Sequence, residues 1–131
     1  MRMSAAGLLA LAGAVPLGAA EPVGVPSGQS VVFVEVIDET SGGEEAVVRF
    51  RFLAPAIAEG GNVDAEAALG DMAALCDSFA LPWLSHEGIV AQTVVISLSD
   101  RPVEFGVTDA EAVQYFEAFQ IEDGACIWEL Y

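Results

Sequence analysis

Histidine and serine are the residue types in this chain that could support nucleophilic catalysis, and both occur in one short stretch. His86 is the only histidine, Ser85 directly precedes it, and Ser78 lies eight residues earlier. A histidine activates a serine when a third group orients its ring and an oxyanion hole is present. The chain has no Gly-x-Ser-x-Gly elbow to present such a serine. We therefore predict no catalytic residue and interpret His86 as a solvated loop side chain beside Glu87, with a small hydrolase as an alternative.

Four acidic residues surround a glycine pair in the first half of the chain: Asp38, Glu39, Glu44 and Glu45. Carboxylate oxygens in a flexible loop are ligands that Ca²⁺ prefers. Their spacing does not match the twelve-residue helix-loop-helix calcium motif. We interpret the segment as a solvated hairpin tip and keep calcium binding as a second alternative. No pattern indicates a cofactor, so none is predicted.

Arg49 and Arg51 are the only closely spaced positive pair after the first twenty residues, because the chain contains no lysine. Residues two apart on a strand share one face of the sheet. With twenty carboxylates in the sequence, internal ion pairing is the expected role of these arginines. Capture of an anionic ligand by the two guanidinium groups is the alternative.

The two cysteines, Cys76 and Cys126, are predicted to form a disulfide. Cys76 lies on the apolar stripe of an expected helix, and Cys126 lies on the core face of an expected final strand. If the stripe packs on that face, both sulfur atoms enter the same layer, as a bridge requires. A redox-active or metal-binding pair is the alternative, but the chain lacks the C-x-x-C spacing and further ligands that either would need.

The first twenty residues read as a secretory signal. Arg2 supplies a positive amino-terminal region, residues 5–17 are uncharged and rich in Ala and Leu, and Gly18 and Ala20 suit a cleavage site. This apolar segment would form about 20 Å of helix, less than the roughly 30 Å of a bilayer core. We predict a signal peptide over 1–20, an extended lead-in over 21–29 and one domain over 30–131, located in the periplasm or secreted, with no stable membrane insertion after cleavage.

Net charge narrows the classes of partner. The formal charge is −16, although 54% of the residues are hydrophobic. Proteins that bind nucleic acid usually present a basic stripe, which so few arginines cannot form. We therefore predict no nucleic-acid binding, and either another exported protein or a small ligand as the partner.

Periodicity predicts two strands that form a hairpin, over 30–37 and 46–53. A register centred on Gly42 would place Glu35 opposite Arg49 as a cross-strand ion pair. A helix over 65–80 follows, with Asp64 as its N-cap and Pro82 as its stop.

The second half is expected to hold three strands and a helix. Alternation predicts a strand over 89–99, a short one over 103–105 and a final one over 125–131. Thr108 and Glu111 have the spacing of a capping box, which predicts a second helix over 109–120. The pair Asp123-Gly124 then turns the chain into the last strand.

Three segments resemble a family of small exported bacterial proteins of unknown function. They are the stretch 76–82, the run ISLSDRPVEFG over 96–106, and the end QYFEAFQIEDGACIWELY over 114–131. Relatives of this kind sometimes carry the label acetolactate synthase, which we reject. The chain is too short for a thiamine-diphosphate enzyme, and Gly70-Asp71 is followed by Met72 rather than by the glycine of the cofactor motif. The resemblance transfers no catalytic residue.

These elements predict an α+β fold: a two-layer sandwich with a five-stranded, mostly antiparallel sheet and two helices on one face, in the order ββαββαβ. The predicted function is a non-enzymatic module that binds a protein or ligand in the periplasm.

Overall fold

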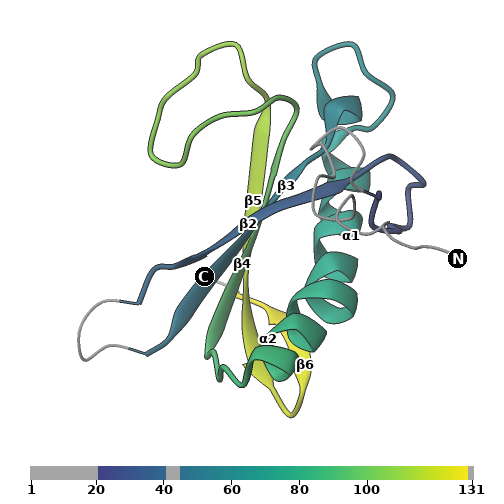
Figure 1. Cartoon of the computed structure of the whole chain (residues 1–131). Coiled ribbons are helices and arrows are strands. Elements are labelled where there is room, and N and C mark those ends of the chain that lie inside the picture. The colour runs from purple at the N-terminus through teal and green to yellow at the C-terminus, as the bar shows by residue number, and fades with distance from the viewer. Residues whose placement is uncertain (1–20, 41–44, 130–131) are drawn as a thin grey trace, which may run out of the picture.

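Five strands form one sheet, and a single helical run covers one of its faces (Figure 1). The computed structural model describes residues 21–40 and 45–129, so the predicted signal peptide lies outside the described residues. The elements are β2 (Val32–Asp38), β3 (Val47–Leu53), a 3-10 turn (Pro55–Ile57), α1 (Ala65–Leu75), a π-helical turn (Cys76–Ala80), α2 (Leu81–Glu87), β4 (Thr93–Ser99), β5 (Gln114–Glu122) and β6 (Ala125–Trp128). None of the described helices is long and apolar enough to span a bilayer.

The strands lie side by side in chain order, β2-β3-β4-β5-β6. Every neighbouring pair is antiparallel except β3 and β4, which are parallel because the helical run lies between them as a crossover. The α+β class and the five-stranded, mostly antiparallel sheet are therefore confirmed. The order of elements is ββαβββ, not the predicted ββαββαβ.

The predicted helix over 109–120 is wrong, and the predicted strand over 103–105 does not form. Residues 114–122 are β5, which pairs along its length with β4. The segment is rich in aromatic residues, which suit a pleated, half-buried surface. At the expected capping box, the Glu111 amide instead donates a hydrogen bond of 2.9 Å to the Asp109 carboxylate, which closes a local turn.

A two-residue turn at Asp123-Gly124 explains why residues 114–122 form a strand. Both residues have positive φ, 52° and 76°, as a type I′ hairpin turn requires. The turn joins β5 to β6 in an antiparallel hairpin. The tight turn and the long pairing with β4 together outweigh the weak local preference for a helix.

The sequence predicts that the helix stops at Pro82. The helical run instead continues through Pro82 to Glu87, and Gly88 is its C-cap. Before the proline, the chain widens into a π-helical turn in which the Leu81 amide donates to the Cys76 carbonyl. A proline ring clashes with the carbonyl of a regular preceding turn and has no amide to offer. The wider turn removes that clash, and α2 ends only where Gly88 adopts φ 72° as a left-handed C-cap.

The start of the helix is as predicted. The Asp64 side chain accepts a hydrogen bond of 2.9 Å from the Ala67 amide, so the N-cap is confirmed.

The hairpin of β2 and β3 has the predicted faces but a different register. Glu35 lies opposite Arg51, and Ile37 lies opposite Arg49, so the pair Glu35–Arg49 does not form. An irregularity between Phe33 and Glu35 shifts the register in which β2 pairs with β3. A shift of two residues keeps each side chain on its face, and the two arginines stay beside carboxylates.

The core lies between the sheet and the helical run. Buried side chains of β3, β4 and β5, among them Phe50, Phe52, Ile96, Leu98 and Phe119, form one cluster with Met72 and Leu75 of α1. Phe79 and Trp83 of the helical run meet Phe50 edge-on, with ring centroids 6.3 and 5.4 Å apart. None of the described helices lies on the opposite face of the sheet, which we call the helix-free face (Figure 1).

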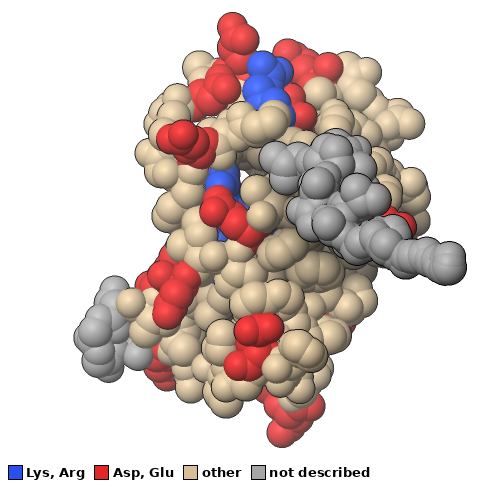
Figure 2. All heavy atoms as spheres, viewed as in Figure 1, with Lys and Arg blue, Asp and Glu red and all other residues tan. Residues whose placement is uncertain are grey.

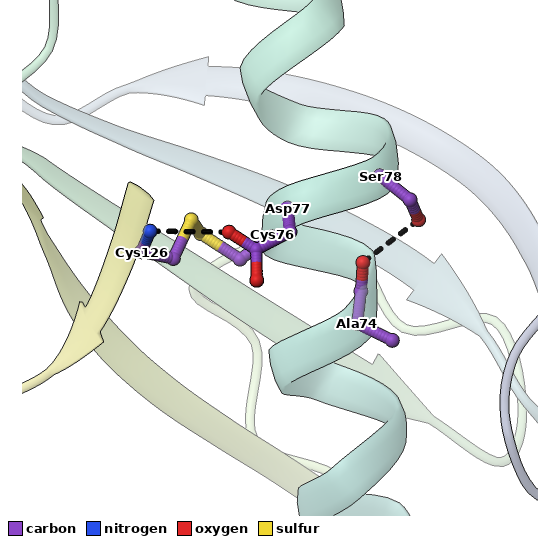
Figure 3. Close-up of a disulfide and its surroundings, with 5 residues drawn as sticks. All are labelled: Ala74, Cys76, Asp77, Ser78 and Cys126. Carbon is purple, nitrogen blue, oxygen red and sulfur yellow. Dashed lines mark hydrogen bonds between the residues drawn. A yellow bond between two sulfur atoms is a disulfide. The ribbon is translucent and has the colours of Figure 1, made fainter. Parts of the chain in front are cut away.

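The predicted disulfide is present in the structure (Figure 3). Cys76, in the π-helical turn, is bonded to Cys126 of β6, with 6.2 Å between their Cα atoms. The Cys126 amide also donates to the Asp77 carboxylate over 3.1 Å. Both contacts tie the edge strand β6 to the helical layer.

The segment before β2 is attached to α1 by one buried carboxylate. Asp71 is fully buried and accepts hydrogen bonds from the Ser27 amide, the Ser27 hydroxyl and the Gln29 side-chain amide, at 2.9, 2.6 and 2.8 Å. A buried carboxylate requires such partners. Val23 and Val25 pack against the core from this same segment.

Candidate binding surface

The helix-free face of the sheet carries an unusual combination of arginine and aromatic side chains. Arg49 and Arg51 on β3 point to this face, since their neighbours Val48, Phe50 and Phe52 are buried in the core. Across the sheet, Arg51 is in register with Ser97 of β4, and Ser97 is in register with Phe116 of β5. The small serine leaves a hollow between the two larger side chains.

Both arginines are paired with carboxylates, as the sequence predicts. Arg49 is bonded to Glu39, and Arg51 is bonded to Glu35. Arg51 also donates to the Val103 carbonyl, and its side chain is only 11% exposed. The arginines therefore serve as internal partners on the sheet and present little free positive charge to an anion.

A tight turn in the loop between β4 and β5 places Phe105 above the arginines. The Val107 amide donates to the Glu104 carbonyl over 3.0 Å, and Gly106 at the third position has φ 86°. A turn with positive φ at that position favours glycine. The Phe105 ring lies 5.5 Å from the Arg49 guanidinium carbon and 5.7 Å from that of Arg51, within the range of cation–π attraction.

Phe116 completes the arrangement from the sheet. Its ring lies 5.6 Å from the Arg49 guanidinium carbon, so Arg49 contacts one aromatic ring from the loop and one from β5. Phe105, Val107 and Phe116 remain 49%, 53% and 65% exposed. We call these three residues the Phe116 cluster.

The Phe116 cluster borders a small cavity of about 180 Å³. Other residues that line it include Arg49, Arg51, Ser97, Glu104 and Tyr115. Pockets that hold small molecules usually measure about 300–1,000 Å³. This cavity has the size of a site for a single inserted side chain.

The base of the loop is fixed by Asp100. Its carboxylate receives hydrogen bonds from the Val113 amide at 2.9 Å and from Arg101 at 3.3 Å. Burial acts to raise the pKa of Asp100, but the hydrogen bonds and the charge of Arg101 outweigh it and hold the pKa below its usual value. The ionised carboxylate thus joins the two ends of the loop that carries Phe105.

The residues considered for catalysis are not brought together. His86 lies in the last turn of α2, not in a loop, and its side chain is 86% exposed, with Nδ1 3.3 Å from Glu87. The Ser78 hydroxyl donates to the Ala74 carbonyl, as Figure 3 shows. No hydrogen bond in the described part of the chain joins His86 to Ser78 or Ser85.

The loop considered for calcium is only partly described, because Glu44 lies outside the described residues. Glu39 is engaged by Arg49, and Asp38 accepts hydrogen bonds from the side chain and the backbone amide of Thr40, which lower the pKa of Asp38. Glu45 is exposed. Within residues 21–40 and 45–129, no group of three or more His, Cys, Asp or Glu side chains is gathered as a metal site requires.

Two wider grooves lie elsewhere on the molecule. One, of about 780 Å³, lies between the loop 57–65 and residues 110–113, and its Arg101 is already paired with Asp100 and Glu111. The other, of about 550 Å³, lies beside α2 and is lined by aliphatic side chains that include Ile89 and Val90. The first groove also contains Tyr115 beside Arg101, but the arginine–aromatic contacts found among the described residues are those of Arg49 and Arg51 with the rings of the Phe116 cluster.

Sequence reasoning missed the Phe116 cluster. Phe116 lies within the predicted helix over 109–120 and Phe105 within the predicted strand over 103–105, and neither element forms. The available signal was the alternation over 114–122 beside the Asp123-Gly124 turn, which places Phe116 and Phe119 on opposite faces of a strand.

A model of a family of unknown function, DUF6497, matches residues 6–131. The match includes the three segments on which the resemblance rests, and also most of the predicted signal peptide. No curated protein and no solved structure shows significant similarity to the chain.

Proposed function

Because this chain belongs to the DUF6497 family, whose function is unknown, we propose its role from the structure: a non-enzymatic, exported module that binds another protein through the Phe116 cluster. The observation that carries this proposal is the exposure of Phe105, Val107 and Phe116 together beside two arginines. Aromatic and arginine side chains are enriched where protein interfaces gain most of their binding energy.

The support for a protein partner comes from the shape of the surface. The helix-free face is broad and its cavity is small, so it suits a partner that lies across the sheet and inserts one side chain. Exposed apolar side chains on a soluble domain favour association when they are contiguous. A small-molecule ligand would have little enclosed volume in which to bury itself.

Two observations support export. The Cys76–Cys126 bond is of a kind that persists in oxidising compartments such as the periplasm. The family match begins at residue 6, so it includes most of the apolar segment before residue 20. Both observations support a signal peptide followed by release of the domain outside the cytoplasm.

Replacing Phe116 by aspartate is expected to abolish capture of the partner. The change places a charge at the centre of the cluster while leaving the core untouched, because Phe116 is 65% exposed. Purified wild-type and Phe116→Asp proteins would each be immobilised and exposed to periplasmic extract, and the bound proteins identified by mass spectrometry. A protein retained reproducibly by wild type should be reduced at least tenfold on the variant.

The matched control is Val90→Asp, since Val90 is 80% exposed and lies in the separate aliphatic groove beside α2. It should retain the partner at the wild-type level, and circular dichroism should show both variants folded. Equal capture by all three proteins, or loss on Val90→Asp alone, would show that the Phe116 cluster is not the binding surface.

A further inference from the structure

We propose that the occupant of the Phe116 cluster is a basic polypeptide segment, with one apolar side chain in the cavity and lysine or arginine side chains on either flank. The inference rests on the proposed function and adds the chemistry of the partner. It follows from the size of the cavity, from the charges that surround it and from the charge of the whole chain.

Both arginines beside the cavity already have carboxylate partners. Glu39 and Glu35 already neutralise Arg49 and Arg51, and the Val103 carbonyl takes a further donor of Arg51. An anionic ligand would have to displace these partners. The guanidinium group of Arg49 instead lies within cation–π range of Phe105 and Phe116 and supports the two rings from beneath the exposed surface.

The charged residues around the cavity, which we call the rim, carry a net negative charge. Glu104 lines the cavity, is exposed, and belongs to no ion pair with the arginines among the described residues. The Glu35 side chain remains 44% exposed despite its bond to Arg51. Two arginines against Glu35, Glu39 and Glu104 leave the rim with a formal charge of −1. A cationic side chain beside the cavity would therefore meet a carboxylate.

The net charge of the whole chain produces a long-range electrostatic field that is also negative. The chain carries a formal charge of −16, and Asp and Glu residues are spread over the surface in Figure 2, where the visible arginine residues lie among them. Such a field accelerates the approach of basic partners and repels acidic ones. It also disfavours a second copy of this chain, which would bring one acidic rim against another.

The occupant can be identified with a display library of random twelve-residue peptides. Wild type would be used for selection and Phe116→Asp for counter-selection. We expect the enriched peptides to contain an aromatic or large aliphatic residue with lysine or arginine within a few positions. Enriched peptides without basic residues, or rich in acidic ones, would overturn the inference, and so would the absence of any enriched peptide.

The rim charge can then be tested with one selected peptide, labelled with a fluorophore and titrated by anisotropy. Glu104→Lys should weaken its binding about tenfold, and the wild-type affinity should fall as salt is raised. Glu66→Lys is the matched control, because Glu66 is exposed on α1 in the opposite layer, and it should change the affinity less than twofold. Equal effects of the two substitutions would mean that only the overall charge matters and would contradict the rim contact.

Failure of this inference is distinct from failure of the proposed function. If capture from extract depends on Phe116 but the selected peptides lack basic residues, the binding surface stands and the partner chemistry is wrong. If capture does not depend on Phe116, the proposed function itself is wrong.

Discussion

Replacement of both Cys76 and Cys126 by alanine is expected to lower the free energy of unfolding by about 4 kcal/mol. The bond closes a loop between residues 50 apart in sequence, so its loss returns conformational entropy to the unfolded chain. Small domains have a total stability of only about 5–15 kcal/mol. The double variant should therefore be close to the limit of stability.

Chemical denaturation followed by tryptophan fluorescence measures this loss. Reduction of the wild type should shift its midpoint to that of the double variant, whereas the same reductant should leave the double variant unchanged. The double substitution avoids an unpaired thiol that could form bonds between molecules. A wild-type midpoint that does not respond to complete reduction would contradict the stabilising role of the bond.

Asp71→Ala is expected to lower the free energy of unfolding by about 3 kcal/mol. The backbone amide and hydroxyl of Ser27 and the side-chain amide of Gln29 would each lose a buried, charged acceptor. The effect should be greatest in the segment before β2, which the carboxylate ties to α1. The structural consequence is opening of residues 23–31 while the sheet remains formed.

Amide hydrogen exchange distinguishes this local opening from general destabilisation. In Asp71→Ala, the amides of Val23 and Ser27 should exchange much faster, whereas those of β4 should change only as far as the global stability falls. Glu66→Ala is the control on the same helix, since Glu66 is exposed, and it should leave both segments unaltered. Unchanged protection at Ser27 would disprove the tether.

The parts of the fold that the sequence predicts correctly are those whose signal is local and strong. The β-branched runs that became β2, β3 and β4 alternate or persist over enough residues to exclude a helix. Asp64 is a polar residue directly before an apolar helical stripe, and it caps α1 as expected. The disulfide was predictable because Cys76 and Cys126 each lie on a core-facing position.

The errors arise where a local signal competes with a distant one. Thr108 and Glu111 have capping-box spacing, but the following residues gain more by pairing with β4 and turning at Asp123-Gly124. Likewise Pro82 disfavours a regular helix, yet a π-helical turn accommodates it within the helical layer. The local sequence of residues 114–122 does not reveal that they pair with β4, and the local sequence around Pro82 does not reveal the π-helical turn.

The binding surface was missed for the same reason. The role of Phe116 depends on its face of β5, which is known only once the segment is recognised as a strand. The contact of Phe105 with Arg49 joins positions 56 residues apart and depends on the loop folding back over β3. The role of the arginines as partners of Glu35 and Glu39 was predictable, whereas their stacking on aromatic rings was not.

Hydrogen exchange of the chain, measured alone and bound to its captured partner or to a selected peptide, tests the central claim most directly. If the Phe116 cluster is the binding surface, protection should increase in the loop that carries Phe105 and Val107 and in β5 around Phe116. The helical run should be unchanged. Protection confined to α2 and the groove around Val90, with no change around Phe105 and Phe116, would contradict the account.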